Sequence, residues 1–239
     1  MRIDEASFPV CLDIVLYKQC TLAPVTHSVI FCGTPDFAVP SLEALVKDDA
    51  FTVLKVITQP DKPVGRKQEV SPPPVKIAAE KLGIPVEQPI NLNSDFNIHK
   101  EEFDFLVVVA YGQLLDEDVL NQPHIAPVNV HASLLPRWRG ASPIQHAILH
   151  QDSESGVTIQ KMVKALDAGP ILSQAAIPLE SNETATSLHD KLSRLGATLL
   201  IETLKNELHP MNQDESKVTH CTKLSRKDGE VDTHSMTAE

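Results

Sequence analysis

Two polar side chains in this sequence have the types and spacing to act together on a carbonyl group. Asn129 and His131 alternate with valines in VNVH, residues 128–131. Alternate side chains of an extended strand share a face, so both would point to the same side. An asparagine amide can donate a hydrogen bond to a developing oxyanion, and a histidine can gain or lose a proton near neutral pH. The pair therefore suits nucleophilic attack on a carbonyl carbon.

A carboxylate is the natural third member of such a site, and Asp167 is the best candidate. It lies in ALDAGP, residues 165–170, where glycine and proline favour a turn. A nearby carboxylate would orient the imidazole and stabilise its protonated form. Each of the three residues also has a purely structural interpretation, because Asn and Asp are common in turns and histidine is often a satisfied core or surface group. Pattern alone leaves both interpretations open.

The sequence lacks the motifs of several other chemistries. HSVIFCG, residues 27–33, has the pattern of a buried strand, but GTPDF follows it in place of the G-x-G-x-x-G of dinucleotide-binding proteins. Thr34 and Pro35 instead suit the start of a helix. Neither G-x-S-x-G nor H-E-x-x-H occurs. We therefore predict direct group transfer, with no metal and no covalent intermediate.

The composition narrows the class of protein further. The 239 residues carry a formal net charge of −11, which does not favour whole-molecule attraction to nucleic acid or to an anionic membrane. The four cysteines show no metal-like spacing, and no apolar run approaches the ~18 residues that a bilayer requires. The acidic N-terminus does not resemble a targeting peptide. These features predict a cytoplasmic protein with no membrane partner.

Strand-like and helix-like segments alternate along the chain. The strand patterns cover residues 27–33, 51–59, 103–112, 126–133 and 156–163, and the helix patterns cover 40–48, 74–83, 143–150 and 187–205. This alternation predicts an α/β fold, a Rossmann-like open and mostly parallel twisted sheet with helices on both faces. Ligands of such sheets bind at the carboxyl ends of the strands, where Asn129 and His131 would lie.

The alternation also divides the chain into three parts. Residues 27–210 are expected to form one catalytic domain. Residues 1–26 have no clear place in the pattern and are interpreted as an N-terminal extension of unclear role. Residues 211–239 are polar, show no obvious core element, and are interpreted as a linker.

The segment 59–76, QPDKPVGRKQEVSPPPVK, is too long and too rich in proline for a simple connection between strand and helix. Lys62, Arg66 and Lys67 give it local positive charge, which suits a phosphate backbone or an anionic cofactor. A mobile, solvated loop is an equally good interpretation of its composition.

Five segments together resemble the methionyl-tRNA formyltransferase family. They are GTPDFAVPSLEAL (33–45), TQPDKPVGR (58–66), VVVAYG (107–112), NVHASLLPRWRGASPIQ (129–145) and LDAGPIL (166–172). The resemblance covers roughly residues 27–232, in order and without large gaps. It implies the formyltransferase fold and transfer of the formyl group of 10-formyltetrahydrofolate to the α-amino group of methionyl-initiator tRNA.

The resemblance also implies roles for individual residues. The catalytic residues of the family match Asn129, His131 and Asp167, and an arginine near the tRNA acceptor end matches Arg66, with Lys62 and Lys67 beside it. The residues implied to contact folate are Ser133, Leu134, Leu135, Pro136, Val109, Tyr111 and Gly112. No metal is implied, and we expect a monomer.

The resemblance has one clear departure. The family carries a C-terminal β-barrel domain that adds positive surface for tRNA, and this chain ends near the expected linker, so weaker tRNA binding is expected. Two alternatives remain open. One is a related folate-dependent enzyme that acts on a small amine or hydrolyses formyl-folate. The other is a noncatalytic remnant.

Overall fold

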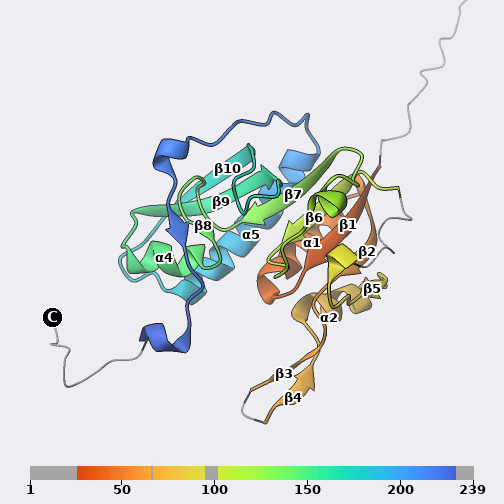
Figure 1. Ribbon diagram of the computed structural model, residues 1–239, viewed down its shortest axis with the longest axis horizontal. Helices are drawn as coiled ribbons and strands as arrows, with labels where there is room; N and C mark the ends of the chain where they lie inside the picture. The colour runs from red at the N-terminus through yellow and green to blue at the C-terminus, as the bar shows by residue number, and fades with distance from the viewer. Residues whose placement is uncertain (1–25, 66, 95–101, 230–239) are drawn as a thin grey trace, which may run out of the picture.

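The computed structural model describes residues 26–65, 67–94 and 102–229. Its centre is a seven-stranded sheet in the order β10-β9-β7-β6-β1-β2-β5 (Figure 1). In chain order its strands are β1 (His27–Gly33), β2 (Phe51–Ile57), β5 (Val86–Glu87), β6 (Phe105–Val109), β7 (Ala126–His131), β9 (Glu154–Lys161) and β10 (Ile171–Pro178). The strands from β7 to β5 are parallel to one another, β9 runs antiparallel to β7, and β10 runs antiparallel to β9. The predicted open, mostly parallel sheet is confirmed.

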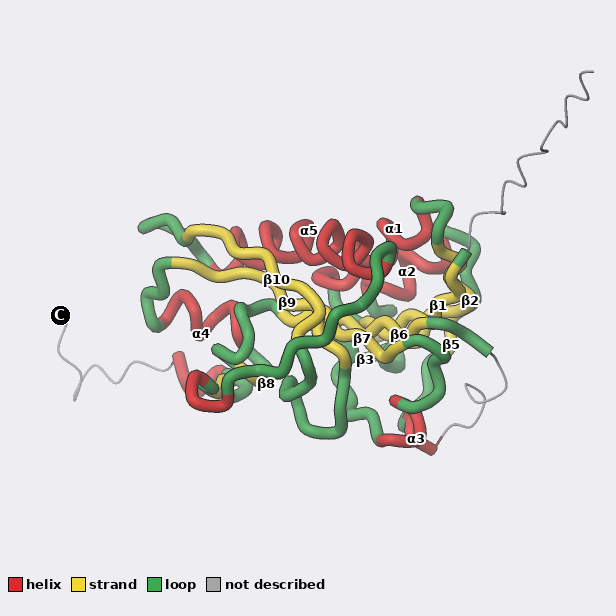
Figure 2. The backbone as a smooth tube through the Cα atoms, turned by 90° about the horizontal axis from the view of Figure 1, so that it is seen from above, coloured by secondary structure: helices red, strands yellow, loops and turns green. Residues whose placement is uncertain are grey.

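Three helices cover one face of the sheet, α1 (Val39–Lys47), α2 (Pro74–Lys81) and α5 (Ala185–Leu204) (Figure 2). α5 begins with a capping box, in which the Thr184 side chain accepts from the Ser187 N–H. Its leucines Leu188, Leu192 and Leu200 are fully buried in the larger apolar core, together with residues of β7 and β9. α4 (Pro143–Leu149) contributes to this same core. The long amphipathic helix predicted from the leucine spacing is therefore present.

The opposite face is covered by α3 (Glu117–Leu120) and by connecting segments (Figure 2). A second apolar core lies there, formed by inward side chains of β1, β2 and β6 together with Val119 and Leu120 of α3. Val29, Ile30 and Phe31 are all fully buried, so β1 buries side chains on both of its faces. This explains why the central strands are continuous apolar runs rather than alternating patterns. The prediction of helices on both faces is confirmed.

β9 departs from the simple strand and helix alternation that the sequence suggests, because it runs antiparallel to β7. α4, which connects the two strands, has 7 residues and spans only about 10 Å. The 6 residues of β7 span about 20 Å, so α4 alone does not run back along the whole strand. In the observed register His131 pairs with Thr158, and residues 154–157 of β9 precede that pair. The chain therefore enters β9 beyond the carboxyl end of β7. β10 is a further strand that the sequence patterns did not predict.

Two segments that were expected to lack regular structure are ordered differently. Part of segment 59–76 forms an antiparallel hairpin of β3 (Lys62–Val64) and β4 (Glu69–Ser71). Part of the predicted linker forms β11 (His220–Cys221), which pairs with β8 (Arg139–Gly140), and Cys221 is buried in the larger core. The expectation that residues 211–239 contain no core element is therefore wrong.

Some predictions fall on residues that the structure does not describe. The N-terminal extension is outside the described residues up to position 25, and so are residues 230–239 and Arg66. Among the described helices, none is both long enough and apolar enough to pass through a bilayer.

Candidate active site

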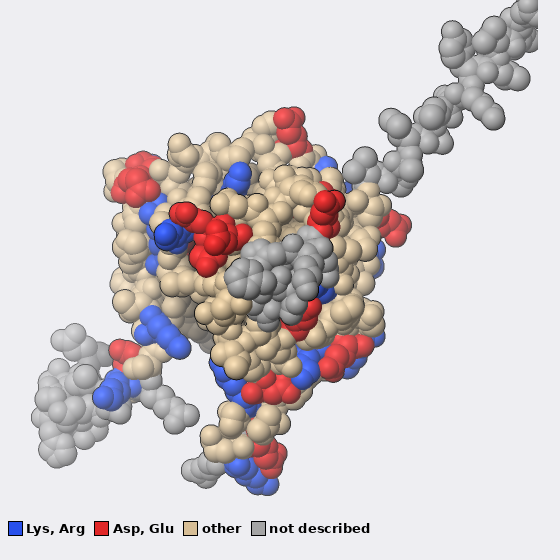
Figure 3. All heavy atoms as spheres, turned by 45° about the vertical axis from the view of Figure 1, so that its right-hand side comes forward, with Lys and Arg blue, Asp and Glu red and all other residues tan. Residues whose placement is uncertain are grey.

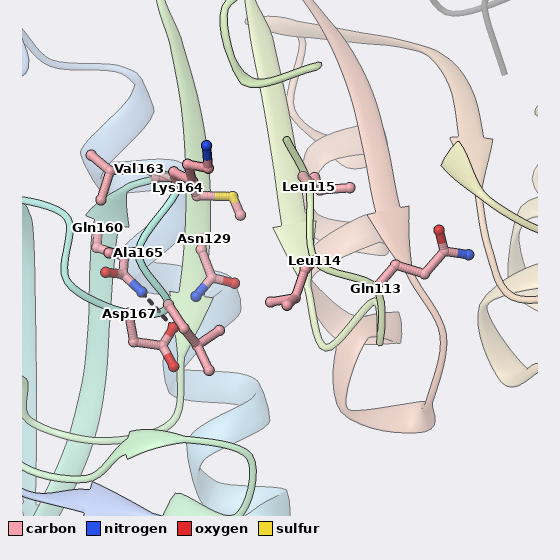
Figure 4. Close-up of a pocket in the computed structure, with 11 residues that line it drawn as sticks. Gln113, Leu114, Leu115, Asn129, Gln160, Val163, Lys164, Ala165 and Asp167 are labelled. Atoms are coloured by element: carbon pink, nitrogen blue, oxygen red, sulfur yellow. Dashed lines mark hydrogen bonds between the residues drawn. The ribbon is translucent and has the colours of Figure 1, made fainter. Parts of the chain in front are cut away.

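The structure brings the three predicted catalytic residues together at the carboxyl end of β7. Asn129 is half-buried on β7, directly opposite Gln160 of β9. Asn129, Gln160 and Asp167 line one side of a pocket, and segment 113–115 lines the other side, with Leu114 pointing toward them (Figure 4). Within the described residues, no hydrogen bond engages the Asn129 amide. That amide is therefore available to donate to a bound group.

Asp167 is held by two donors from different segments. Its Oδ1 accepts a hydrogen bond from Gln160 Nε2 at 2.9 Å, and its Oδ2 accepts from the Gly140 backbone N–H at 2.9 Å. The side chain is only 8% exposed. Asp167 has a φ of 51°, a left-handed conformation that aspartate tolerates better than most residues. The turn thus points the carboxylate inward from a sparsely populated backbone conformation.

His131 faces Asp167 from the end of β7. Its Nδ1 lies 3.6 Å from Asp167 Oδ1, within ion-pair range but too long for a good hydrogen bond. Its Nε2 lies 2.9 Å from the Trp138 carbonyl oxygen, which can only accept, so Nε2 carries the proton. Nδ1 therefore faces the carboxylate, and a second proton there would place a cationic ring beside an anion. The imidazole is buried and does not itself line the pocket.

A ring of contacts fixes the loop that holds the Trp138 carbonyl. Asp152 accepts from Trp138 Nε1 at 2.7 Å and from Arg137 Nε at 2.9 Å, and the Arg137 guanidinium lies over the indole. Burial alone would raise the pKa of Asp152, but the hydrogen bonds from Arg137 and Trp138 outweigh it and hold that pKa below its ordinary value. These contacts set the position of the oxygen to which His131 donates.

Exposed aliphatic side chains form part of the rim of the pocket, beside Lys164. Leu114, Leu166 and Val163 are 68%, 57% and 41% exposed, although large aliphatic side chains are usually buried. Such a rim suits a flat, largely apolar ligand whose polar end reaches Asn129 and Asp167. No group of three His, Cys, Asp or Glu side chains in the described ranges is placed to hold a metal ion.

The residues expected to contact folate lie beside this pocket rather than in its lining. Val109 and Tyr111 are buried in the two cores, and Gly112 is exposed just before the lining residue Gln113. Ser133 and Leu135 are buried as well. Their contact with folate stays a prediction.

The turn SLLP, residues 133–136, packs on β9 and β10. The Leu135 N–H donates to Thr158 Oγ1, and Gln174 Nε2 donates to the Leu135 carbonyl. Ser133 Oγ donates to the Arg137 carbonyl at 2.6 Å. The Leu135–Pro136 peptide bond is cis, and the half-buried Leu134 packs beside Gly156. These hydrogen bonds fix the turn, which follows β7, against β9 and β10.

The predicted tRNA-facing lysines are on the β3–β4 hairpin, which projects from the body (Figures 1 and 3). Lys62 and Lys67 are exposed, while Arg66 lies outside the described residues. The base of the hairpin is fastened by Asp61, which accepts from Lys76 Nζ at 2.9 Å and from Gln88 Nε2 at 2.7 Å. The projection is thus anchored to α2 and to the segment after β5.

Sequence reasoning missed Gln160, the lining segments 113–115 and 162–166, and the Gly140 N–H. Gln160 offered a signal, because a glutamine in the apolar strand GVTIQ is unusual unless its amide has buried partners. The backbone donor of Gly140 offered none.

Comparison with known proteins identifies the family of the chain. The sequence matches the formyl transferase family over residues 26–204. It is 48% identical to a methionyl-tRNA formyltransferase of Halorhodospira halophila over 210 residues, 85% of this chain and 67% of that protein. It is 45% identical to a methionyl-tRNA formyltransferase of a Geobacillus species, again over 85% of this chain and over 66% of that protein.

The fold is also that of solved N-formyltransferases. The enzyme of Helicobacter canadensis, solved with folinic acid and dTDP-3-aminofucose, aligns with a TM-score of 0.63 at 21% identity, over 83% of this chain and 71% of that one. The chain spans about two thirds of the length of the curated relatives it matches. With a family match over three quarters of its residues and relatives that are nearly half identical, the chain belongs to the formyl transferase family.

Proposed function

We propose that the chain transfers the formyl group of 10-formyltetrahydrofolate to the amino group of methionyl-initiator tRNA. The observation that carries the proposal is that Asn129 and Asp167 line one pocket, while the buried His131 imidazole lies 3.6 Å from the Asp167 carboxylate. The identity to methionyl-tRNA formyltransferases supports the choice of acceptor. Because the chain covers about two thirds of those relatives, we treat the substrates as part of the proposal.

The reaction forms one carbon–nitrogen bond, breaks another, and moves one proton. The amine nitrogen attacks the formyl carbon, and the carbonyl oxygen becomes an oxyanion to which the Asn129 amide donates. The bond from carbon to the folate nitrogen then breaks, and the proton lost by the amine is returned to that nitrogen. Asp167 faces the pocket and serves as the carrier of this proton.

His131 acts in this proposal through its charge. Both of its ring nitrogens face protein oxygens, so in this arrangement a protonated ring stabilises the oxyanion electrostatically rather than by a direct hydrogen bond. The same positive charge balances Asp167 while that carboxylate is ionised. Loss of the imidazole therefore removes a charge from the transition state and leaves a buried carboxylate with no cation beside it.

Different parts of the surface suit the two substrates. The apolar rim of Leu114, Val163 and Leu166 suits the ring system of the folate. The hairpin lysines Lys62 and Lys67 suit phosphates near the acceptor end of the tRNA. On a chain with a net charge of −11, such local positive charge is needed to oppose general repulsion of the nucleic acid.

The test is single-turnover transfer of labelled formyl to methionyl-initiator tRNA with protein in excess at low salt. Asn129→Ala removes the oxyanion donor without breaking a hydrogen bond among the described residues, so we expect transfer to fall by about 10² to 10³-fold. The double variant Lys62→Ala, Lys67→Ala is expected to leave the rate at saturating tRNA unchanged. The slope of the logarithm of the tRNA binding constant against the logarithm of the salt concentration should become shallower by about one for each phosphate that a lysine no longer neutralises. Transfer to a small amine but not to the tRNA would replace this function with the first alternative.

A further inference from the structure

The chain beyond α5 crosses the two loops that build the catalytic site. We call residues 211–221 the C-terminal strap (Figure 1). At its start, Met211 and Ile171 exchange two backbone hydrogen bonds of 2.9 and 2.8 Å. At its end, β11 pairs with β8, and Thr219 Oγ1 accepts from the Trp138 N–H. The strap therefore contacts both the turn of Asp167 and the loop of Trp138.

Gln213 is the strap residue that reaches the turn of Asp167. Its Nε2 donates to the Asp167 carbonyl at 2.8 Å and to the Gly169 carbonyl at 2.7 Å. Its Oε1 accepts from Arg139 Nε at 2.9 Å. One side-chain amide thus uses both of its N–H groups on the turn and its oxygen on the neighbouring loop.

Arg139 fixes the orientation of that amide. Its guanidinium is buried, can only donate, and also pairs with Glu215 at 2.8 Å. The Gln213 oxygen must therefore face Arg139, and its N–H groups must face the two carbonyls. Because the two requirements agree, the amide has a single favourable orientation.

The turn needs such support. A non-glycine residue in the left-handed region is strained, and it persists where the surroundings hold it. Asp167 adopts that conformation, and Gly169 lies so close to Lys161 that a Cβ at this position would be 1.8 Å from the Lys161 carbonyl oxygen. The two hydrogen bonds from Gln213 hold the backbone on either side of Ala168, which fixes the direction of the Asp167 side chain.

We infer that Gln213 is a positioning residue for Asp167, so that the strap sets the distance between the Asp167 carboxylate and the His131 imidazole. This inference rests on the proposed function in assigning Asp167 a part in formyl transfer. It adds a residue outside the pocket and 46 positions further along the chain. The C-terminal strap is then part of the frame of the catalytic site.

Gln213→Glu tests the donated bonds with little change of shape. One oxygen of the new carboxylate can still accept from Arg139 Nε. The other oxygen takes the place of the N–H groups and faces the Asp167 and Gly169 carbonyl oxygens, to which it cannot donate. Gln213→Met removes the amide without adding charge, and serves if the first variant does not fold. Ser28→Ala is the matched control, because it removes two side-chain hydrogen bonds with Asp104 at the amino end of β1, whereas the catalytic site lies at the carboxyl end of β7, a strand parallel to β1.

Two readouts separate positioning from a general loss of stability. The first is the pair of imidazole nitrogen chemical shifts of His131 in labelled protein, with Asp167→Asn as the reference for a missing carboxylate. The second is the single-turnover rate of formyl transfer with both substrates saturating. We expect the His131 shifts of Gln213→Glu to move toward those of the reference and the rate to fall by about 10-fold or more, since small misplacements of catalytic groups are costly. Ser28→Ala is expected to match the wild type in both.

The outcomes distinguish this inference from the proposed function. Unchanged His131 shifts in a folded Gln213 variant overturn the inference, whatever the rate does. A rate that falls equally in the Gln213 variants and in Ser28→Ala, at equal folded fraction, also overturns it. Absence of transfer by the wild type would refute the proposed function. The His131 spectrum would still decide whether Gln213 positions Asp167.

Discussion

Asp167→Asn removes the charge of the site with little change in its shape. The asparagine oxygen can still accept from the Gly140 N–H, as Oδ2 does at 2.9 Å. The new amide nitrogen would face Gln160 Nε2, but Gln160 Oε1 is buried and, among the described residues, has no hydrogen-bond partner. Rotation of the Gln160 amide would present that oxygen to the new N–H. We therefore expect the variant to fold.

The size of the effect follows from the distance between the two groups. Asp167 Oδ1 lies 3.6 Å from His131 Nδ1. At an effective dielectric constant of about 20, two unit charges at that separation interact by about 4.6 kcal/mol. Each 1.36 kcal/mol corresponds to about tenfold in rate, so complete loss of this interaction in the transition state has a ceiling of roughly 10³-fold. The asparagine dipole retains part of it, but asparagine also cannot carry the proton that the proposed mechanism assigns to Asp167. We therefore expect a total loss of at least about 10²-fold.

The assay is single-turnover formyl transfer with protein in excess, and it needs a control for the removal of a carboxylate as such. Asp48→Asn is suitable, because Asp48 also accepts from a backbone N–H, that of Ala50 at 3.0 Å, and pairs with Lys205 at 2.9 Å at the amino end of β2. The control is expected to remain within about 2-fold of the wild type, as exposed ion pairs contribute little. Transfer by Asp167→Asn within about 3-fold of the wild type would refute the role of the charge.

Three further predictions concern stability and thiol chemistry. Gly169→Ala places a Cβ 1.8 Å from the Lys161 carbonyl oxygen, so we expect urea denaturation to show a loss of about 2–4 kcal/mol, and a loss below about 0.5 kcal/mol would contradict the packing. The pKa of Asp152 lies below its ordinary value, so its charged form stabilises the fold above pH ~3.9, and this contribution is lost as the pH falls through the folded-state pKa. The melting temperature of Asp152→Asn should therefore fall less steeply from pH 6 to pH 3 than that of the wild type. Equal slopes for the two proteins would contradict this role of Asp152. Burial raises the pKa of the Cys32 and Cys221 thiols, so iodoacetamide should label both after unfolding and neither before it, as peptide mapping can test.

The strands and helices of the main domain could be predicted because burial leaves a strong pattern. β1 was predicted at residues 27–33, and the structure has it there, since its apolar run ends at a glycine, Gly33. α5 was predicted within a few residues from its leucine spacing. The direction of β9 could not be read in the same way, because a strand buried on both faces looks alike whether it runs parallel or antiparallel.

β10 escaped prediction for the opposite reason. Its residues Ile171–Pro178 alternate between partly buried and exposed positions at the edge of the sheet, and serine, glutamine and alanine give them little apolar character. The β3–β4 hairpin escaped because proline and charge dominate its sequence. Both are edge or projecting elements, where backbone pairing with a neighbour decides the structure and side-chain burial contributes little.

The catalytic side chains of the candidate site could be predicted from the sequence, but the backbone groups that position them could not. Asn129 and His131 share a strand, so their spacing alone predicts a common face, and Asp167 was the best candidate for the acid. What fixes their geometry is a set of backbone groups: the Trp138 carbonyl, the Gly140 N–H and the Asp167 carbonyl that Gln213 holds. Every residue except proline has both of these groups, so no residue type marks them in a sequence. The polar segment after α5 looked like a linker for this reason, although its contacts brace the turn on which the proposed chemistry depends.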